Sequence, residues 1–339
     1  MQPITVLSLF DGMSCGRLAL ERAGIPVENY WACEIDKYAA QVSRNNRDDV
    51  FHLWDVSDLS WWDFSEDVCW EPIDLLIGGS PCQWFSNAGK GLNFEDSRSK
   101  LFFEFVRILN EAKPRCFLLE NVKMKKEWQN IISENLFWIQ PVEIDSALVS
   151  AQRRKRLYRV GKRNEDWSYS QVVVNQPEDK GILLKDILED KVEESYYINQ
   201  EKVQNTDTKQ SNFLKKILFN INPSGKGMNG NVYNPEHKSP TLTTNKGEWI
   251  KIIQLPRGKN IWGIIDRKTP TLSANLWQHN NLLQEWYRVR RLTPIECERL
   301  QTLPDDYTTG VSNSQRYKML GNGWTIDIIA HIFREMFHD

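Results

Sequence analysis

The chain has 339 residues, of which 40% are hydrophobic, so it can bury a sizeable core and form two domains. Its net charge of −2 excludes nucleic-acid binding through overall positive charge and leaves only local basic patches for that role. The six cysteines show no C-x-x-C spacing, which argues against a zinc site or a disulfide framework. No apolar run approaches the length that a membrane span needs, and the N-terminal residues resemble a strand and not a signal peptide. We therefore expect a globular cytoplasmic protein without a metal.

The first third of the chain alternates strands and helices. Residues 4–10 predict a strand, residues 11–16 a glycine-containing loop, and the next segment, through Ala23, a helix. This layout is typical of nucleotide-like cofactor sites, although the spacing is not G-x-G-x-x-G. Two more strands end in Glu34 and Asp55, which suit ribose hydroxyls and an adenine amino group. Each carboxylate alone is more often a surface group or a helix cap. The alternation predicts a doubly wound, largely parallel α/β sheet.

A cysteine follows the next buried strand. Residues 73–77 predict this strand, which ends at a Gly-Gly pair before Pro81 and Cys82. A lone cysteine is usually a small buried hydrophobe. Here, however, Glu120 closes the strand predicted at 116–119, and a basic segment, residues 152–156, opens another. A thiol, a carboxyl group and guanidinium groups at neighbouring strand ends predict a covalent active site.

The remaining elements follow from periodicity and capping signals. We predict helices at 98–111, with Ser97 as N-cap, and at 123–136, and strands at 142–148 and 155–160. Helical pattern is otherwise weak until Thr293, Pro294 and Glu296 form a capping box, apart from 183–189 and 211–219. Residues 320–324 are expected to open a closing helix at 325–336. The polar region 175–285 repeats a Pro-Thr-Leu unit at 237–245 and 267–275, which fits a small β-rich domain or a solvated insertion.

These motifs, in this order, resemble the C5-specific DNA cytosine methyltransferase family over almost the whole chain. The matching segments are 10–16, Pro81-Cys82-Gln83, Glu120-Asn121-Val122, 152–156, 290–296 and Gly321-Asn322-Gly323. Their tight spacing is similar to that of bacterial or phage members. The resemblance implies a Rossmann-like, S-adenosylmethionine-dependent catalytic domain at 1–168 plus 314–339. It also implies a β-rich target-recognition domain at 169–313.

The resemblance also implies the chemistry. C5 of cytosine is a poor nucleophile, and a thiolate that adds to C6 turns the ring into an enamine that can take a methyl group. Cys82 matches this thiol, and Glu120 would hold the N3 and N4 edge of the base. Arg154 and Arg156 would stabilise the adduct as fixed positive charges. Because the base cannot be reached inside a duplex, it has to be flipped out.

Binding residues follow from the same resemblance. S-adenosylmethionine would contact Phe10, Asp11, Gly12, Met13, Ser14, Cys15, Gly16, Glu34, Ile35, Asp55, Val56, Pro81, Leu101, Asn322, Gly323 and Trp324. Double-stranded DNA would contact Gln83, Ser86, Lys90, Gln152, Arg153 and Arg159. One chain carries every motif, so we expect a monomer with no obligatory protein partner. A bacterial or phage-infected cell is the expected setting.

Several positions depart from the family pattern: Trp54, Trp84, Asn87, Ala88 and Arg159. They fit neutral repacking, or alternatively an altered base or a carboxylated donor that Arg159 would pair. Two other classes compete with an active DNA enzyme. A catalytically inactive DNA-binding relative would lack the thiol, the acid or the arginine pair, and all three are present. An RNA-directed member would carry a Cys-Phe-Thr segment in the recognition region, and the sequence has none.

Overall fold

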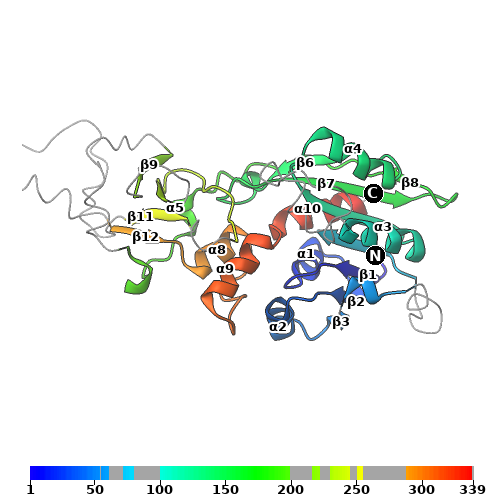
Figure 1. Cartoon of the computed structure of the whole chain (residues 1–339), viewed down its shortest axis with the longest axis horizontal. Coiled ribbons are helices and arrows are strands. Elements are labelled where there is room, and N and C mark those ends of the chain that lie inside the picture. Colours follow the sequence, from blue (N-terminus) through cyan, green and yellow to red (C-terminus); the bar gives the residue numbers. More distant parts are fainter. Residues whose placement is uncertain are drawn as a thin grey trace, which may run out of the picture.

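The computed structural model describes residues 1–53, 55–60, 72–79, 100–198, 216–221, 230–244, 250–254 and 288–337. Figure 1 shows two β-sheets at opposite ends of the molecule. Helices surround the larger sheet, and helices α8 (Pro294–Leu300) and α9 (Asn313–Asn322) lie between the two sheets. No helix among these described residues is both long and apolar enough to cross a membrane.

The larger sheet contains the strand ends that matter for function. Its order is β3-β2-β1-β4-β5-β7-β6, with β8 paired to β7. The strands are β1 (Ile4–Leu9), β2 (Val27–Cys33), β3 (Phe51–Leu53), β4 (Leu75–Gly79), β5 (Cys116–Val122), β6 (Val142–Asp145), β7 (Lys155–Arg163) and β8 (Tyr169–Gln171). Strands β1 to β5 run parallel, and β7 is antiparallel to β5, β6 and β8. The predicted doubly wound, mostly parallel sheet is confirmed.

Helices cover both faces because successive strand residues point to opposite sides. In β5, Leu118 packs in the core that includes α1 (Cys15–Ala23), α2 (Lys37–Asn46) and α10 (Ile326–Phe337). Its neighbours in β5, Phe117 and Leu119, pack in the other core, with α3 (Lys100–Ala112) and α4 (Lys126–Asn135). We refer to these as the α10 face and the α4 face.

The smaller sheet has the order β12-β11-β10-β9. Its strands are β9 (Ile217–Asn220), β10 (Asn231–Tyr233), β11 (Lys251–Gln254) and β12 (Arg288–Arg291), and only β10 and β11 run parallel. The helix expected at 211–219 is therefore wrong where the structure describes it. Leu218 is buried in the small core, and pairing of β9 with β10 outweighs the local helical pattern. Residues 211–215 lie outside the described part.

Short elements connect the sheets: helix α5 (Leu184–Ile187), a 3₁₀ turn (Glu194–Tyr196) and α8. The capping box predicted for α8 is confirmed, since Thr293 Oγ1 accepts from the Glu296 amide and Glu296 Oε2 from the Thr293 amide. Glu296 also forms a bidentate ion pair with Arg290 of β12, at 2.6 and 2.7 Å, with both side chains fully buried. This pair joins the small sheet to α8.

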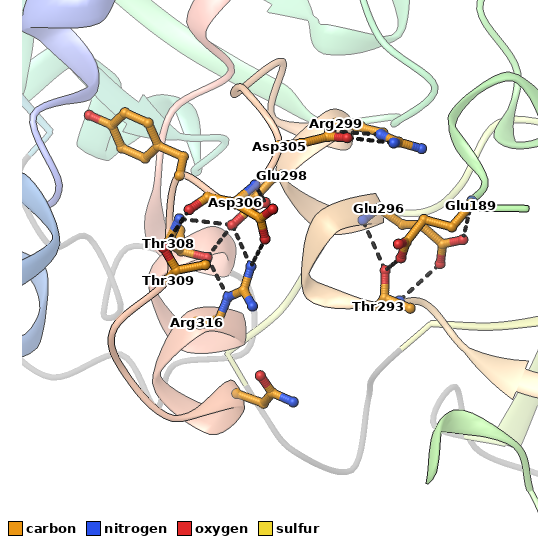
Figure 2. Close-up of polar contacts among 12 residues, drawn as sticks. Glu189, Thr293, Glu296, Glu298, Arg299, Asp305, Asp306, Thr308, Thr309 and Arg316 are labelled. Atoms are coloured by element: carbon orange, nitrogen blue, oxygen red, sulfur yellow. Dashed lines mark hydrogen bonds and ion pairs between the residues drawn. The ribbon is translucent and has the colours of Figure 1, made fainter. Parts of the chain in front are cut away.

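A second buried carboxylate lies on the same helix. Glu298 accepts hydrogen bonds from the Asp306 and Thr308 amides at 2.8 Å and from Arg316 at 2.8 Å. Figure 2 shows this cluster beside the Thr293–Glu296 cap. Because Arg316 lies in α9, the cluster fixes α9 against α8. The sequence analysis did not predict α9, because its residues are mostly polar and its apolar residues show only a weak helical periodicity. Leu320, Gly321 and Asn322 therefore close α9, whereas we expected them to open α10.

Strand β8 belongs to the large sheet through its pairing with β7. We therefore propose a domain boundary after Gln171, slightly later than the boundary after residue 168 expected from the sequence. Two other expected spans match only in part. The helix expected at 98–111 is α3, Lys100–Ala112, where the structure describes it, and residues 97–99 lie outside the described part. The strand expected at 142–148 is β6 followed by a 3₁₀ turn, Ser146–Leu148.

Candidate active site

An ion pair stands at the carboxyl end of β5. Glu120 Oε1 lies 2.9 Å from Nε of Arg156 on the neighbouring strand β7, and Glu120 is only 8% exposed. The second carboxylate oxygen, Oε2, accepts a hydrogen bond from Nε1 of Trp324 at 3.4 Å. These contacts place Glu120 on the α10 face. The structure thus brings together the acid and one of the two arginines predicted from the sequence.

The other arginine, Arg154, has a different place. It is 3% exposed, and its guanidinium donates to the carbonyl oxygens of Gly321 at 3.1 Å and Gly323 at 2.9 Å. Burial, and then the nearby charge of Arg156, lower the pKa of Arg154 to about 9. Arg154 therefore holds the segment between α9 and α10 in place, and both printed hydrogen bonds of its guanidinium go to protein carbonyls.

The loop after β1 adopts strained conformations around a buried carboxylate. Phe10, Gly12 and Ser14 all have left-handed backbones, with φ of 58°, 67° and 60°. Asp11 accepts hydrogen bonds from Ser14 Oγ at 2.7 Å, from Ser8 Oγ at 2.6 Å and from Tyr30 at 2.7 Å. This network fixes the loop at the start of α1. Strained loops held by their surroundings are concentrated at binding sites.

Glu34 lies against this loop. Its Oε2 accepts from the Gly12 amide at 2.8 Å and its Oε1 from the Asp36 amide at 2.6 Å. Burial raises the pKa of Glu34, and the hydrogen bonds from these two amides partly offset that rise. Beyond it, the apolar side chain of Ile35 is 74% exposed. Asp55, which follows β3, is partly buried and accepts from the Ser57 amide at 2.9 Å.

These groups fit a nucleoside-containing donor. An exposed aliphatic side chain can cover an adenine face, and partly buried carboxylates can accept from ribose hydroxyls and an amino group. The remaining predicted donor residues have varied placements. Met13, Cys15, Gly16 and Val56 are buried, Leu101 and Gly323 are partly buried, and Asn322 is exposed at the end of α9. Pro81 lies outside the described residues.

The described cysteines are unsuited to nucleophilic attack. Cys15, Cys33, Cys116 and Cys297 are all buried. Burial raises the thiol pKa of each of them, to about 12 for Cys15 and Cys33. A thiol that stays protonated at neutral pH is a poor nucleophile. Cys82, the predicted nucleophile, lies outside the described residues, as do Gln83, Ser86 and Lys90.

Of the predicted DNA-contacting residues that the structure describes, only Arg153 is exposed. Gln152 is fully buried, as is Arg159, whose guanidinium bonds the Gln129 carbonyl of α4 at 2.8 Å and Asn121 at 3.2 Å. Arg159 therefore lies on the α4 face, opposite Glu120. A fully buried guanidinium does not reach a duplex, so we remove Arg159 from the DNA-binding set. The proposal of a carboxylated donor paired by Arg159 is also withdrawn, because the guanidinium is directed to α4, on the face of the sheet opposite Glu120.

The sequence analysis missed the contacts that residues 238 and 239 make with the segment before β7. Ser239 pairs with the segment before β7, donating to the Ala151 carbonyl at 2.7 Å and accepting from the Arg153 amide at 3.0 Å. Lys238 donates to the carbonyls of Ala147 at 2.5 Å and Ser150 at 3.2 Å. The Pro-Thr-Leu repeat was the available signal, since its first copy contains this segment. The second copy lies outside the described residues.

Comparisons with known proteins agree with this geometry. The family model of C-5 cytosine-specific DNA methylase matches residues 4–338. The orphan methyltransferase M.SPRI of Bacillus phage SPR is 33% identical, over 100% of this chain and 98% of its own. The type II methyltransferase M1.ScrFI of Lactococcus lactis is 29% identical, over 98% of this chain and 77% of its own.

Solved structures agree in fold. The Entamoeba histolytica methyltransferase EhMeth aligns with a TM-score of 0.70 at 18% identity, over 100% of this chain and 99% of its own. The S. pombe Dnmt2 methyltransferase aligns with a TM-score of 0.64 at 18% identity, over 99% of each chain. At such identities the likeness shows the fold alone. The family match, the phage relative and the Glu120–Arg156 pair together lead to one assignment: the chain belongs to the C-5 cytosine-specific DNA methylase family and is a DNA cytosine-5 methyltransferase.

Proposed function

We propose that the protein methylates a flipped cytosine in double-stranded DNA through a covalent bond between Cys82 and C6, with S-adenosylmethionine as donor. The observation that carries the proposal is the Glu120–Arg156 pair at the end of β5. Gly79 of β4 pairs with Glu120 in register. Cys82 follows Gly79 by three residues, and three residues of chain span at most about 11 Å. This short span supports the proposal that the thiol acts at the same end of the sheet as Glu120.

The groups divide the reaction among them. The Cys82 thiolate adds to C6. Glu120, fixed by Arg156, holds the base edge by accepting from the N4 amino group, and the positive charge of Arg156 offsets the negative charge that develops on the ring. When bound, S-adenosylmethionine would supply the electrophilic methyl group and would leave as S-adenosylhomocysteine. C5 takes that methyl group and then loses its proton to a base, and the C6–S bond breaks to return the thiolate. Arg154, which bonds the Gly321 and Gly323 carbonyls, maintains the site without touching the base.

The binding partners follow from the same assignment. The donor would lie against the β1 loop, with Glu34 toward the ribose, Asp55 toward the adenine and Phe10 stacked on the ring. Arg153 is exposed shortly before β7, and we propose that it contacts a DNA phosphate. We propose that the enzyme acts as a monomer in the cytoplasm of a bacterial or phage-infected cell.

Nucleoside mass spectrometry tests the reaction. Genomic DNA without C5 methylation, which offers many target sequences, is incubated with the protein and S-adenosylmethionine. The proposal expects one methyl group gained on deoxycytidine by the wild type. Cys82→Ala should give no product while duplex binding persists, and Cys297→Ala, a change at a buried thiol remote from β4, serves as the matched control. Continued methylation by Cys82→Ala would exclude the covalent route.

A further inference from the structure

Trp324 contacts the acid of the active site from a distant part of the chain. It lies in the short connection between α9 and α10, and its indole Nε1 donates to Glu120 Oε2 at 3.4 Å. The sequence analysis assigned Trp324 only to donor binding. The hydrogen bond is longer than the usual 2.9–3.0 Å, a feature common at catalytic groups before the substrate binds.

The indole lies against two glycines, and the absence of a side chain at Gly79 makes room for it. A Cβ atom on Gly79 would lie 2.9 Å from Nε1 of Trp324 and 3.0 Å from Oε2 of Glu120. At the other end of the ring, a Cβ atom on Gly16 would lie 3.5 Å from Cζ3. Gly79 ends the strand that leads to Cys82, and Gly16 belongs to the loop and helix beside the donor site. The indole therefore spans the distance between these two parts of the site.

The backbone that carries Trp324 is itself held in place. Arg154 bonds the carbonyls of Gly321 and Gly323, and the side-chain amide of Gln301 donates to the Leu320 carbonyl at 2.6 Å. Gly323 packs closely on the donor loop, since an added Cβ atom would lie 3.0 Å from Cε of Met13. Trp324 is thus a fixed donor rather than a surface side chain that reaches Glu120 by chance.

We propose that Trp324 is a positioning residue for Glu120 in the methyl-transfer reaction. The terminal torsion of a glutamate is soft, so a carboxyl group held at one oxygen can rotate. Arg156 holds Oε1 and Trp324 holds Oε2, so the plane of the carboxyl group is fixed before cytosine arrives. Each oxygen keeps a lone pair that can accept from the N4 amino group of the base. This inference rests on the role proposed above for Glu120.

Kinetics of Trp324→Phe test the inference, because phenylalanine keeps an aromatic ring and removes the N–H donor. We expect kcat to fall about tenfold, the size of one lost net hydrogen bond. The KM values for DNA and for S-adenosylmethionine should change less than about twofold, because the group acts in the transition state. Trp138→Phe, at an exposed tryptophan on the far side of the sheet, is the matched control and should match the wild type.

A spectroscopic readout separates positioning from folding. In ¹⁵N-tryptophan-labelled protein, the indole N–H resonance of Trp324 is identified as the one that is missing from Trp324→Phe. This resonance should shift in Glu120→Ala, because its hydrogen-bond acceptor is gone. If Trp324→Phe does not fold, a shifted indole resonance in Glu120→Ala still supports the contact, and no shift overturns it. If Glu120→Ala is inactive and Trp324→Phe is fully active, the positioning role of Trp324 is refuted and the proposed function stands. A fully active Glu120→Ala would instead refute the proposed function.

Discussion

Arg156 and Glu120 meet across two antiparallel strands, with Nε of Arg156 2.9 Å from Oε1 of Glu120. Glu120 stands opposite Tyr158 in the register of β5 and β7, so the arginine reaches it diagonally. Both side chains lie on the α10 face at the end of the sheet to which β4 also leads. The pair combines a geometric task, fixing a carboxyl group, with an electrostatic one, supplying positive charge beside the reacting base.

This relationship predicts that Arg156→Lys is impaired although its charge is kept. A lysine is a point charge and lacks the planar fork of arginine, so it would not fix the carboxyl plane in the same way. We expect kcat to fall about 10- to 100-fold with little change in the KM for the donor. Lys155→Arg, at the exposed neighbouring position, is the control. Wild-type turnover by Arg156→Lys would show that charge alone suffices.

Arg159 and Arg153 are predicted to behave in opposite ways. Arg159→Met removes a buried guanidinium that bonds α4, so the melting temperature should fall while the salt dependence of DNA binding stays unchanged. Arg153→Met should leave the melting temperature unchanged and reduce the slope of log affinity against log salt by about 1. Thermal melts and binding titrations at several salt concentrations measure both. A reduced slope for Arg159→Met would show that Arg159 contacts DNA.

The sequence predicted much of the fold and the identity of the site residues, because the family motifs lie at strand ends. It did not predict which face each motif residue would occupy. Arg154, Arg156 and Arg159 belong to one basic run, yet their guanidinium groups bond a backbone turn, Glu120 and α4 respectively. These partners come from segments far along the chain, and no local pattern encodes them. The Trp324–Glu120 contact, across 204 residues, was invisible for the same reason.

The donor site is predicted to depend on pH through Glu34. Burial raises the pKa of the free carboxyl group, whereas ribose hydroxyls that donate to it would lower the pKa in the complex. Binding would then release a proton, so affinity should rise as pH increases through the raised pKa and level off above it. Calorimetric titration with S-adenosylmethionine between about pH 4.5 and 6.5 measures this trend. Glu34→Gln should flatten it, and an equally steep trend in that variant would assign the proton to another group.

The ion pair between the small sheet and α8 is predicted to be important for stability. Arg290→Met leaves the fully buried Glu296 without its guanidinium partner, which typically costs about 3–5 kcal/mol. Arg288→Met, two residues earlier on the same strand, breaks an exposed pair with Glu194 and should change stability far less. Urea unfolding of both variants gives the comparison. Equal losses would mean that the buried pair contributes no more than a surface contact.

The central claim is the covalent bond from Cys82, and adduct mapping tests it most directly. Genomic DNA containing 5-fluorodeoxycytidine is incubated with the protein and S-adenosylmethionine; fluorine at C5 cannot leave as a proton does, so the adduct persists. Chymotrypsin cleaves after aromatic residues, and Trp70 lies between Cys69 and Cys82, so the two thiols fall on separate peptides. The account predicts a nucleotide mass on the peptide that contains Cys82. Methylation of ordinary DNA with no adduct there, or with the adduct on Cys69, would contradict it.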